Sequence, residues 1–553
     1  MRIRHRLFAG VAAGAVALAL VAPATAANAA SAVAARSPLA QGEEDANPDN
    51  NINAFGLCQA APALGLSFKY GKPSRGEVDV INNDGVDPTT GNSNSGCGAP
   101  QNETTIAVNP RNPRNLIAGA NDYRLLSPAS GRLDGTGWAY SSFDGGQTWR
   151  DVLLPSLTVQ TGGTGVLGQV DAAGDPVITF SPDGVAYYAN IVFSRLSDAS
   201  GITVSKSMDG GRSWSQPSVV EFDNTIQIFN DKEWIAAGKD GRVTVSWTRF
   251  DSDAAGNYLQ SPIVAKSSKD GGKTWGAQVP VSDDAHPYNQ GSQIAYGEDG
   301  DLSISYEGAT PSTGYATDVL LMAHRSGDAK PFQNAELAKV YDDLDCYPVY
   351  AGRQTLSNQH FRLNSYPSMA RDPDSGTISI VWADNEGSGT CGQGGSTFAG
   401  TTSNQVKLVA GKWGKFSGVK KLTSRADKVF PSVSANDGKV VVTYYTAGYS
   451  SKNPACFVRI PDGQPAGNFV VPSSTSVCLD YASLSSENGF RSERRLTSEG
   501  SNPYVEFADG SFIGDYSQVA LGKDGVAHAA WTDFRGRPGT NAPNQDVYVS
   551  NYR

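Results

Sequence analysis

One strand-turn-strand pattern recurs along most of this chain: a short apolar segment, a turn with Gly, Asp or Asn, and a longer segment that often ends in Trp. We count seven copies, at residues 106–120, 177–189, 234–247, 294–306, 367–382, 431–445 and 519–531. The copies show no helical periodicity, and more strand-like sequence follows them. Units of this kind every 60 to 90 residues are typical of the four-stranded blades of a β-propeller. The sequence therefore predicts an all-β propeller of four-stranded blades, with seven blades or, as the alternative, six.

Composition and charge limit the classes of function. The 553 residues include 61 Gly and 22 Tyr but only 4 Met, which suits a β-protein with many turns. The formal net charge of -10 argues against nucleic acid as a partner, because phosphate binding needs a basic surface. The mean hydropathy of -0.34 and the lack of a second long apolar run argue against a multi-span membrane protein.

The first residues have the pattern of a secretion signal. A basic start is followed by an apolar run at residues 7–21 and by two small-x-small cleavage sites before residue 30. We therefore expect a signal peptide at residues 1–29 and a disordered leader at residues 30–50. The product is expected to be secreted and extracellular, with no membrane partner, and to act as a monomer.

The ends of the chain predict how the ring closes. The last repeat has only three strand-like segments, so its blade lacks a fourth strand. Within an N-terminal extension at residues 51–100, either 66–70 or 78–81 could supply that strand and remove the exposed edges. The alternative is a loose extension held by a disulfide. The propeller itself is assigned to residues 101–553.

An eight-residue motif, S-x-D-G-G-x-[ST]-W, occurs three times at a nearly constant spacing. The copies are residues 142–149, 207–214 and 268–275, and they contain the pairs Asp144 and Trp149, Asp209 and Trp214, and Asp270 and Trp275. The Asp accepts hydrogen bonds from turn amides and the glycines adopt positive φ, so each motif predicts a β-hairpin turn. We expect the Trp to pack into the next layer.

This motif resembles the Asp-box, or bacterial neuraminidase repeat, of the sialidase superfamily. The resemblance covers about residues 100–553. In that family the box joins the outer strands of a blade, away from the active site, so it supports a fold and not a catalytic role.

Six cysteines lie beyond the predicted signal peptide. An even number in an oxidising compartment predicts disulfides. Since short loops close most easily, we expect the pairs Cys58–Cys97, Cys346–Cys391 and Cys456–Cys478. No Cys-x-x-Cys or Cys/His cluster suggests zinc.

Alignment of the seven repeats by their first apolar strand predicts one acidic and aromatic face near the axis. One level would hold Glu103, Asp175, Lys232, Gly291, Ser365, Val429 and Asp515. The next level would hold Thr104, Pro176, Glu233, Ser292, Tyr366, Phe430 and Tyr516. Rings and carboxyl groups of this kind suit a sugar-binding pocket, although the same residues could simply cap strand ends.

The resemblance to sialidases implies a tyrosine nucleophile activated by a glutamate, an aspartate acid/base, and arginines that bind the substrate carboxylate. Matched to the family pattern, these are Tyr516, Glu233 and Asp134, with Arg249 as one arginine. Candidates for a third arginine are Arg362, Arg491 and Arg494. Where the family has Arg-Ile-Pro, this chain has Glu103, which would repel a carboxylate.

Three hypotheses remain open. The chain is a sialidase-like glycoside hydrolase of extracellular glycans, a glycosidase or lyase for neutral sugars that uses two carboxylates such as Asp175 and Asp515, or a non-catalytic propeller that binds a glycan or a protein. No cofactor is expected. The oxygen-rich segment at residues 79–87 could hold a structural Ca²⁺, or be an ordinary turn.

Overall fold

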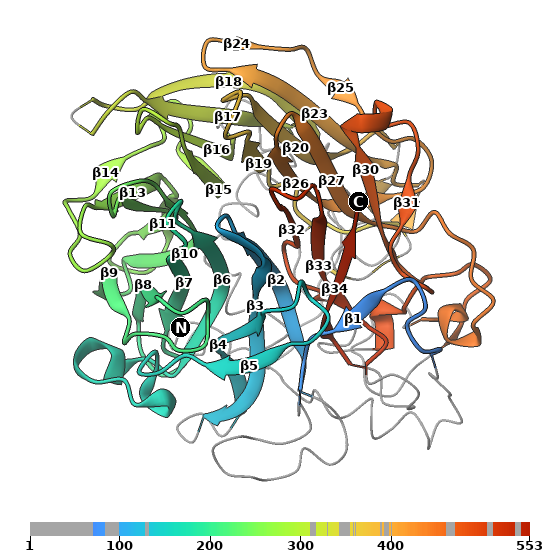
Figure 1. Ribbon diagram of the computed structural model, residues 1–553, viewed down its shortest axis with the longest axis horizontal. Helices are drawn as coiled ribbons and strands as arrows, with labels where there is room; N and C mark the ends of the chain where they lie inside the picture. Colours follow the sequence, from blue (N-terminus) through green and yellow to red (C-terminus); the bar gives the residue numbers. More distant parts are fainter. Residues whose placement is uncertain are drawn as a thin grey trace, which may run out of the picture.

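The computed structural model is a ring of seven antiparallel sheets around a central axis (Figure 1). It describes residues 70–82, 99–127, 132–309, 317–328, 330–341, 354–357, 359, 361–387, 390–391, 398–399, 401–459, 471–505, 512–536 and 544–553. Six blades begin with their innermost strand and continue outward, and the seventh is completed by a strand from the N-terminal part of the chain. The predicted all-β propeller is therefore confirmed, with seven blades.

The first four blades follow one another along the chain. Blade 1 contains β2 (Gln101–Asn109), β3 (Asn112–Ser127), β4 (Arg132–Ser142) and β5 (Arg150–Leu153). Blade 2 contains β6 (Ala172–Phe180), β7 (Ala186–Phe193), β8 (Ala199–Ser207) and β9 (Ser218–Asn224). Blade 3 contains β10 (Ile228–Ala237), β11 (Val243–Ser252), β13 (Ile263–Ser268) and β14 (Val279–Pro280), with β12 (Tyr258–Gln260) beside β11. Blade 4 contains β15 (Tyr288–Tyr296), β16 (Leu302–Ala309), β17 (Thr317–Arg325) and β18 (Gln333–Tyr341).

The remaining three blades complete the ring. Blade 5 contains β19 (Ser368–Arg371), β20 (Ile378–Asn385), β23 (Asn404–Lys412) and β24 (Lys415–Phe416), with β25 (Lys420–Lys421) beside β23. Blade 6 contains β26 (Lys428–Asn436), β27 (Lys439–Thr446), β30 (Asp480–Ser485) and β31 (Arg494–Arg495). Blade 7 contains β32 (Gln518–Leu521), β33 (Ala527–Asp533), β34 (Asp546–Tyr552) and β1 (Glu77–Asp79).

Short elements occupy the connections. Two small hairpins are formed by β21 (Thr390–Cys391) with β22 (Phe398–Ala399), and by β28 (Val458–Arg459) with β29 (Val471–Pro472). The 3₁₀ turns are η3 (Val159–Thr161), η4 (Gly165–Gln169), η6 (Pro454–Phe457), η7 (Ser486–Asn488) and η8 (Pro503–Val505). No helix among the residues described is long and apolar enough to cross a membrane.

The N-terminal strand β1 closes the ring as the outermost strand of blade 7. Val78 pairs with Val549 of β34 in an antiparallel register, and the two strands lie side by side in Figure 1. Arg535 holds this strand from the inside, because its Nη1 donates to Glu77 Oε1 at 3.2 Å while its Nε donates to Asp533. Of the two predicted closing segments, the one at residues 78–81 overlaps β1, so closure by an N-terminal strand is confirmed.

Neighbouring innermost strands are joined by hydrogen bonds from backbone to side chain. The Ile178 N–H donates to Thr105 Oγ1 at 3.2 Å, and the Ile106 N–H donates to Gln518 Oε1 at 2.9 Å. In the same way, a backbone N–H of the next blade donates to the side chain of Gln293 in blade 4, of Ser368 in blade 5 and of Ser432 in blade 6. Apolar side chains such as Trp247 fill the space between blades outside these bonds. Because the bond recurs from blade to blade, the residues whose side chains accept it occupy equivalent positions in their blades.

These equivalences correct the predicted alignment. Two residues before each equivalent position stand Glu103, Asp175, Lys232, Gly291, Tyr366, Phe430 and Tyr516, which therefore share one level at the axis. The prediction was one residue out in blades 5, 6 and 7, where it placed Ser365, Val429 and Asp515 at this level. The apolar pattern shows which residues face the core, but it does not fix the number of residues between the first apolar residue and the axial level.

The three repeated motifs form turns at the outer side of blades 1, 2 and 3, between the third and fourth strands. In the first, Asp144 Oδ1 accepts from the Thr148 N–H at 3.0 Å and from Ser142 Oγ at 2.8 Å. The other two repeat this geometry around Asp209 and Asp270. The Asp side chains therefore close their own turns and do not line the axis.

The motif tryptophans pack between blades to different depths. Trp214 is buried and meets Tyr188 edge to face, whereas Trp149 and Trp275 are only half-buried. Trp275 Nε1 also donates to Ser218 Oγ of blade 2 at 3.1 Å. The layer into which Trp275 packs is therefore the preceding blade of the ring.

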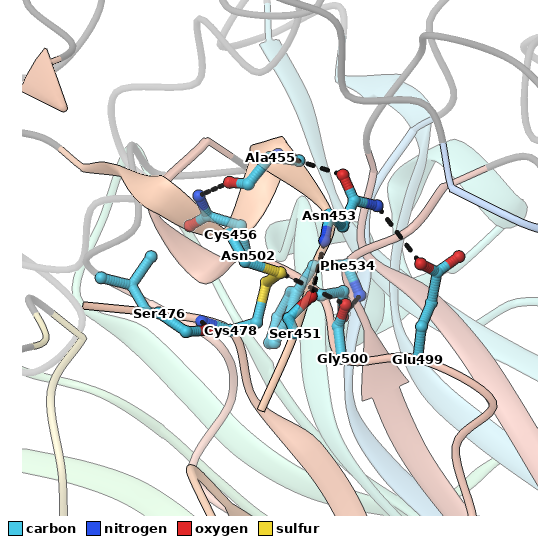
Figure 2. The surroundings of a disulfide bond; sticks show 12 residues. Ser451, Asn453, Ala455, Cys456, Ser476, Cys478, Glu499, Gly500, Asn502 and Phe534 are labelled. Atoms are coloured by element: carbon cyan, nitrogen blue, oxygen red, sulfur yellow. Dashed lines mark hydrogen bonds between the residues drawn. A yellow bond between two sulfur atoms is a disulfide. The ribbon is translucent and has the colours of Figure 1, made fainter. Parts of the chain in front are cut away.

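One of the three expected disulfides lies within the described residues. Cys456 and Cys478 are bonded with a Cα–Cα distance of 5.0 Å, close to Asn502 and Gly500 (Figure 2). The pair Cys58–Cys97 lies outside the described residues, as does Cys346, and nothing is known of the Cys391 side chain. Those two pairs stay predictions.

Several other predictions fall outside the described residues. These are the signal peptide at residues 1–29, the leader at residues 30–50 and most of the oxygen-rich segment at residues 79–87. In the part of the chain that the structure describes, no group of three or more His, Cys, Asp or Glu is arranged to hold a metal ion.

We predict that Asp144→Ala lowers the free energy of unfolding by about 1 kcal/mol, because the turn loses hydrogen bonds to the carboxylate. Burial of Asp144 is slight, and hydrogen bonds from Thr148 and Ser142 hold its pKa well below the usual range. Urea unfolding of the purified protein measures the change. Asp284→Ala, at an exposed aspartate outside these motifs, is the control and should change stability by less than half as much.

We predict a larger loss for Arg535→Ala, of about 3–5 kcal/mol, because it leaves two buried carboxylates, Glu77 and Asp533, without their cation. The same urea titration measures this loss. Arg114→Ala, at an exposed arginine in blade 1, should be close to neutral. A loss for Arg535→Ala as small as that of Arg114→Ala would show that this ion pair does not hold the closing strand.

Candidate functional site

A narrow recess opens at the axis beside the innermost strands of blades 1, 2 and 3. It encloses about 390 Å³ of empty space, of which about 20 Å³ admits the centre of a water molecule. Its lining is mostly charged and aromatic, with the acids Glu103, Asp134, Asp175 and Asp231, the cations Arg195, Lys232 and Arg362, and the rings of Tyr123, Phe193 and Phe512. Of the predicted axial residues, Glu103, Asp175 and Lys232 line this recess, whereas its aromatic rings are not the ones that the sequence analysis named.

Three of the lining residues stand at β-bulges with left-handed backbone. Glu103, Asp175 and Lys232 have φ of 55°, 51° and 50°, and the strand register shifts at each of them. A bulge re-aims a side chain, and a left-handed conformation in a non-glycine residue is strained. The fold accepts this strain at Phe430 of the same level as well, where φ is 48°, and the side chains of Glu103, Asp175 and Lys232 meet at the axis.

Lys232 is the centre of the charged cluster. Its Nζ lies 3.1 Å from Glu103 Oε1, 3.1 Å from Asp175 Oδ2 and 3.0 Å from Asp515 Oδ2. These carboxyl groups come from blades 1, 2 and 7, so one ammonium group from blade 3 links four blades. It also lies 4.9 Å from the centre of the Tyr516 ring.

Asp515 is held as a carboxylate. Arg362 grips it with two hydrogen bonds, from Nε at 3.0 Å and from Nη2 at 2.7 Å. Burial opposes its ionisation, but the charges of Arg362 and Lys232 outweigh burial and hold the pKa of Asp515 well below its usual range. Asp515 therefore stays charged.

Glu103 and Asp175 have the opposite character. Burial, the charge of Asp175 and that of Asp515 raise the pKa of Glu103 well above its usual range, and Lys232 only partly offsets them. Burial also raises the pKa of Asp175. The Asn121 amide donates to Glu103 Oε2 at 2.8 Å and fixes the carboxyl group in place. Both shifts favour the neutral, protonated form of the Glu103 and Asp175 pair.

Asp134 enters the same recess from β4 and forms a bidentate ion pair. Arg195 donates to it from Nε at 3.0 Å and from Nη2 at 2.9 Å, and both side chains are buried. Asp134 therefore contributes an ion-paired carboxyl group that is separate from the Glu103 and Asp175 pair.

Tyr516 and Glu233 are not joined to each other. Tyr516 Oη donates to the Pro176 carbonyl at 3.1 Å. Glu233 is buried, and within the described part of the chain neither of its carboxylate oxygens has a hydrogen-bond partner. Burial and the charge of Asp175 raise the pKa of Glu233 well above its usual range, and burial raises that of Tyr516.

The remaining predicted residues lie elsewhere. Arg249 on β11 pairs with Asp251 at 3.1 Å, and Arg494 on β31 is at the outer edge of blade 6. Tyr366 packs its ring against Gly291 in blade 4. The structure therefore brings Asp134, Asp175 and Arg362 into the recess, with Asp515 and Tyr516 beside Lys232.

Two functional candidates were missed by the sequence analysis. Lys232 stood in the predicted axial level but was given no role, although a lone lysine among acids at that level is a usable signal. Arg195 lies in the loop after β7 and carries no sequence signal, because its importance comes only from the approach of Asp134.

Comparison with known proteins finds no matching family model and no matching curated protein. Among solved structures, the chain is similar to an α-L-arabinanase of Penicillium chrysogenum, with 12% identity and a TM-score of 0.43, covering 86% of this chain and 97% of the other. A GH93 α-L-arabinofuranosidase of Fusarium graminearum is similar at 11% identity and a TM-score of 0.43, and the match covers 87% of this chain and 98% of the other. The NanB sialidase of Streptococcus pneumoniae is similar at 10% identity and a TM-score of 0.40, and the match covers 79% of this chain and 83% of the other. Values this low assign no activity or substrate to this chain, and the fold rests on its sheet topology.

We predict that Glu103→Gln becomes more stable relative to the wild type as the pH rises above about 4.5, the ordinary pKa of a glutamate. Above that pH the unfolded chain has lost the Glu103 proton while the folded protein keeps it, so wild-type stability falls with pH. The glutamine variant lacks this contribution, and the difference should grow by up to about 1.4 kcal/mol per pH unit.

Urea unfolding at pH 5 and pH 7.5 measures this difference. Glu298→Gln, at an exposed glutamate, is the control and should show no pH-dependent gain. A flat difference for Glu103→Gln would mean that Glu103 is ionised in the folded protein.

Proposed function

We propose that this chain is a secreted glycoside hydrolase of extracellular glycans and that its chemistry takes place in the axial recess. The observation that carries the proposal is the presence of two kinds of carboxyl group in one recess. Burial raises the pKa values of Glu103 and Asp175, which favours their protonated form, whereas Asp134 is ion-paired with Arg195. Glycoside hydrolysis uses one carboxylic acid to protonate the leaving oxygen and one carboxylate as base or nucleophile.

The roles follow from this division. Glu103, with Asp175 sharing its proton, is the general acid, and Asp134 is the carboxylate that acts on the sugar or on a water molecule. Lys232 and Arg362 are positioning residues that do not need to touch substrate, since Lys232 contacts both acids and Arg362 holds Asp515 beside Lys232. Phe193, which lines the recess, offers an apolar surface for a sugar ring.

The charges favour a neutral sugar over a sialic acid. Each cation that lines the recess already pairs with a carboxylate: Arg195 with Asp134, Arg362 with Asp515, and Lys232 with three acids. A substrate carboxylate would have to compete with these pairs, and Glu103 stands where the sialidase pattern has an arginine. Tyr516 donates its hydroxyl hydrogen to the Pro176 carbonyl and not to Glu233, which argues against Glu233 as the base that activates Tyr516.

A second candidate function is a non-catalytic propeller that binds a glycan or a protein. The small accessible space in the recess favours it, because about 20 Å³ admits a water molecule but not a sugar ring. For catalysis the recess must therefore widen when a substrate binds.

The test is a panel of fluorogenic glycosides, with neutral pyranosides, neutral furanosides and a sialoside, assayed with the purified protein. We expect hydrolysis of a neutral glycoside, reduced at least 100-fold in kcat by Glu103→Gln and by Asp134→Asn. Asp284→Asn, at an exposed site, should keep full activity.

Two results would contradict the proposal. Hydrolysis of the sialoside alone, lost in Tyr516→Phe, would restore the sialidase mechanism. No hydrolysis of any member of the panel, together with binding to a glycan array, would favour the non-catalytic propeller.

A further inference from the structure

A second cavity lies far from the axis, at the seam where blade 6 meets blade 7. We call it the seam groove; its walls include Arg75, Tyr449, Glu493, Arg494, Arg495 and Ser550. About 600 Å³ of it is accessible to water-sized molecules, against about 20 Å³ in the axial recess. Space of this size accommodates a short oligosaccharide.

The groove gathers three arginines in a chain whose formal net charge is -10. Arg495 is already used, because its Nη2 pairs with Asp480 at 2.7 Å. Arg494 donates from Nη1 at 2.7 Å to an oxygen of the Arg553 main-chain carboxylate, and its other guanidinium donors remain available. Among the described residues, no carboxylate pairs with Arg75, and the side chains of Arg75 and Arg494 are both exposed.

The two available arginines come from different parts of the fold. Arg75 immediately precedes the closing strand β1, and Arg494 is on β31 of blade 6. Arg494 is held over the Tyr552 ring at 4.8 Å from its centre, so its position is set before any ligand binds. The one acid in the wall, Glu493, already accepts from Tyr444 Oη at 2.7 Å.

We propose that the seam groove is a second binding site, for an acidic saccharide whose carboxylate or sulfate groups meet Arg75 and Arg494. A guanidinium group presents paired donors that fit the two oxygens of such an anion. Two arginines on different segments favour a ligand with more than one anionic group. Ser550 and Tyr449 also line the groove, and Arg495 lies over the Tyr449 ring at 4.8 Å from its centre.

This site differs from the axial recess in one decisive respect. Every cation lining the recess is paired with a carboxylate, whereas Arg75 in the groove is not. The groove therefore binds the acidic part of a glycan even if the recess acts on neutral sugars. The proposal does not depend on the proposed hydrolase activity, because its test measures binding alone.

The test is calorimetric titration of the full-length secreted protein with three trisaccharides: trigalacturonate, a sulfated galactotriose and neutral galactotriose. We expect the acidic ligands to bind and the neutral one not to bind. Affinity should fall at least tenfold in Arg75→Ala/Arg494→Ala, and it should also fall between 50 and 500 mM salt, since both arginines are exposed. Binding of only one acidic ligand identifies the anionic group as carboxylate or sulfate.

Arg114→Ala, at an exposed arginine in blade 1, is the matched control and should bind like the wild type. Arg75→Ala alone is the second variant, because Arg75 makes no side-chain contact within the described residues and its loss leaves the fold intact. Equal affinity in the wild type and both groove variants would overturn the proposal, as would the absence of binding by either acidic ligand.

Discussion

The buried ammonium group of Lys232 is the interaction on which the centre of this propeller depends. Three carboxyl groups from blades 1, 2 and 7 lie about 3 Å from it. Without that charge, Glu103, Asp175 and Asp515 would repel one another in a site that water scarcely reaches. Burial of an ammonium group is itself unfavourable, and only the surrounding acids make it acceptable. The ring and its charged centre are therefore stable only together.

The chemistry of the recess follows from the same cluster. Arg362 and Lys232 hold Asp515 ionised, so the remaining positive charge does not suffice for Glu103 and Asp175. The protonated form of that pair is therefore favoured. The arrangement that stabilises the axis thus also creates a carboxylic acid, a few side chains away from the Asp134 carboxylate.

The sequence predicted the architecture well because the signals for it are local. Turn motifs around Asp144, Asp209 and Asp270, and apolar strands at regular spacing, specify blades without reference to the rest of the chain. Closure by residues 77–79 could also be predicted, because an unpaired strand edge is unfavourable wherever it occurs. The disulfide between Cys456 and Cys478 agrees with the same preference for short loops.

The site was less predictable because its contacts join distant segments. Tyr366 and Tyr516, rather than Ser365 and Asp515, lie at the level of Glu103, and the apolar pattern does not fix this offset of one residue. Arg195 and Arg362 come from loops between strands, so their partners Asp134 and Asp515 are known only once the ring has closed. Residue types indicated an acidic centre, but pairing decides which acids stay charged.

Ring closure also explains why the seam groove exists. Arg75 reaches the rim only because β1 leaves the N-terminal part of the chain and adds to β34, and Arg535 anchors that strand through Glu77. Arg494 arrives independently, on the last strand of blade 6. The two arginines face one cavity only in the closed ring, where the interior cations are already neutralised. An acidic ligand therefore has its best opportunity at the seam, and its binding would favour the closed state.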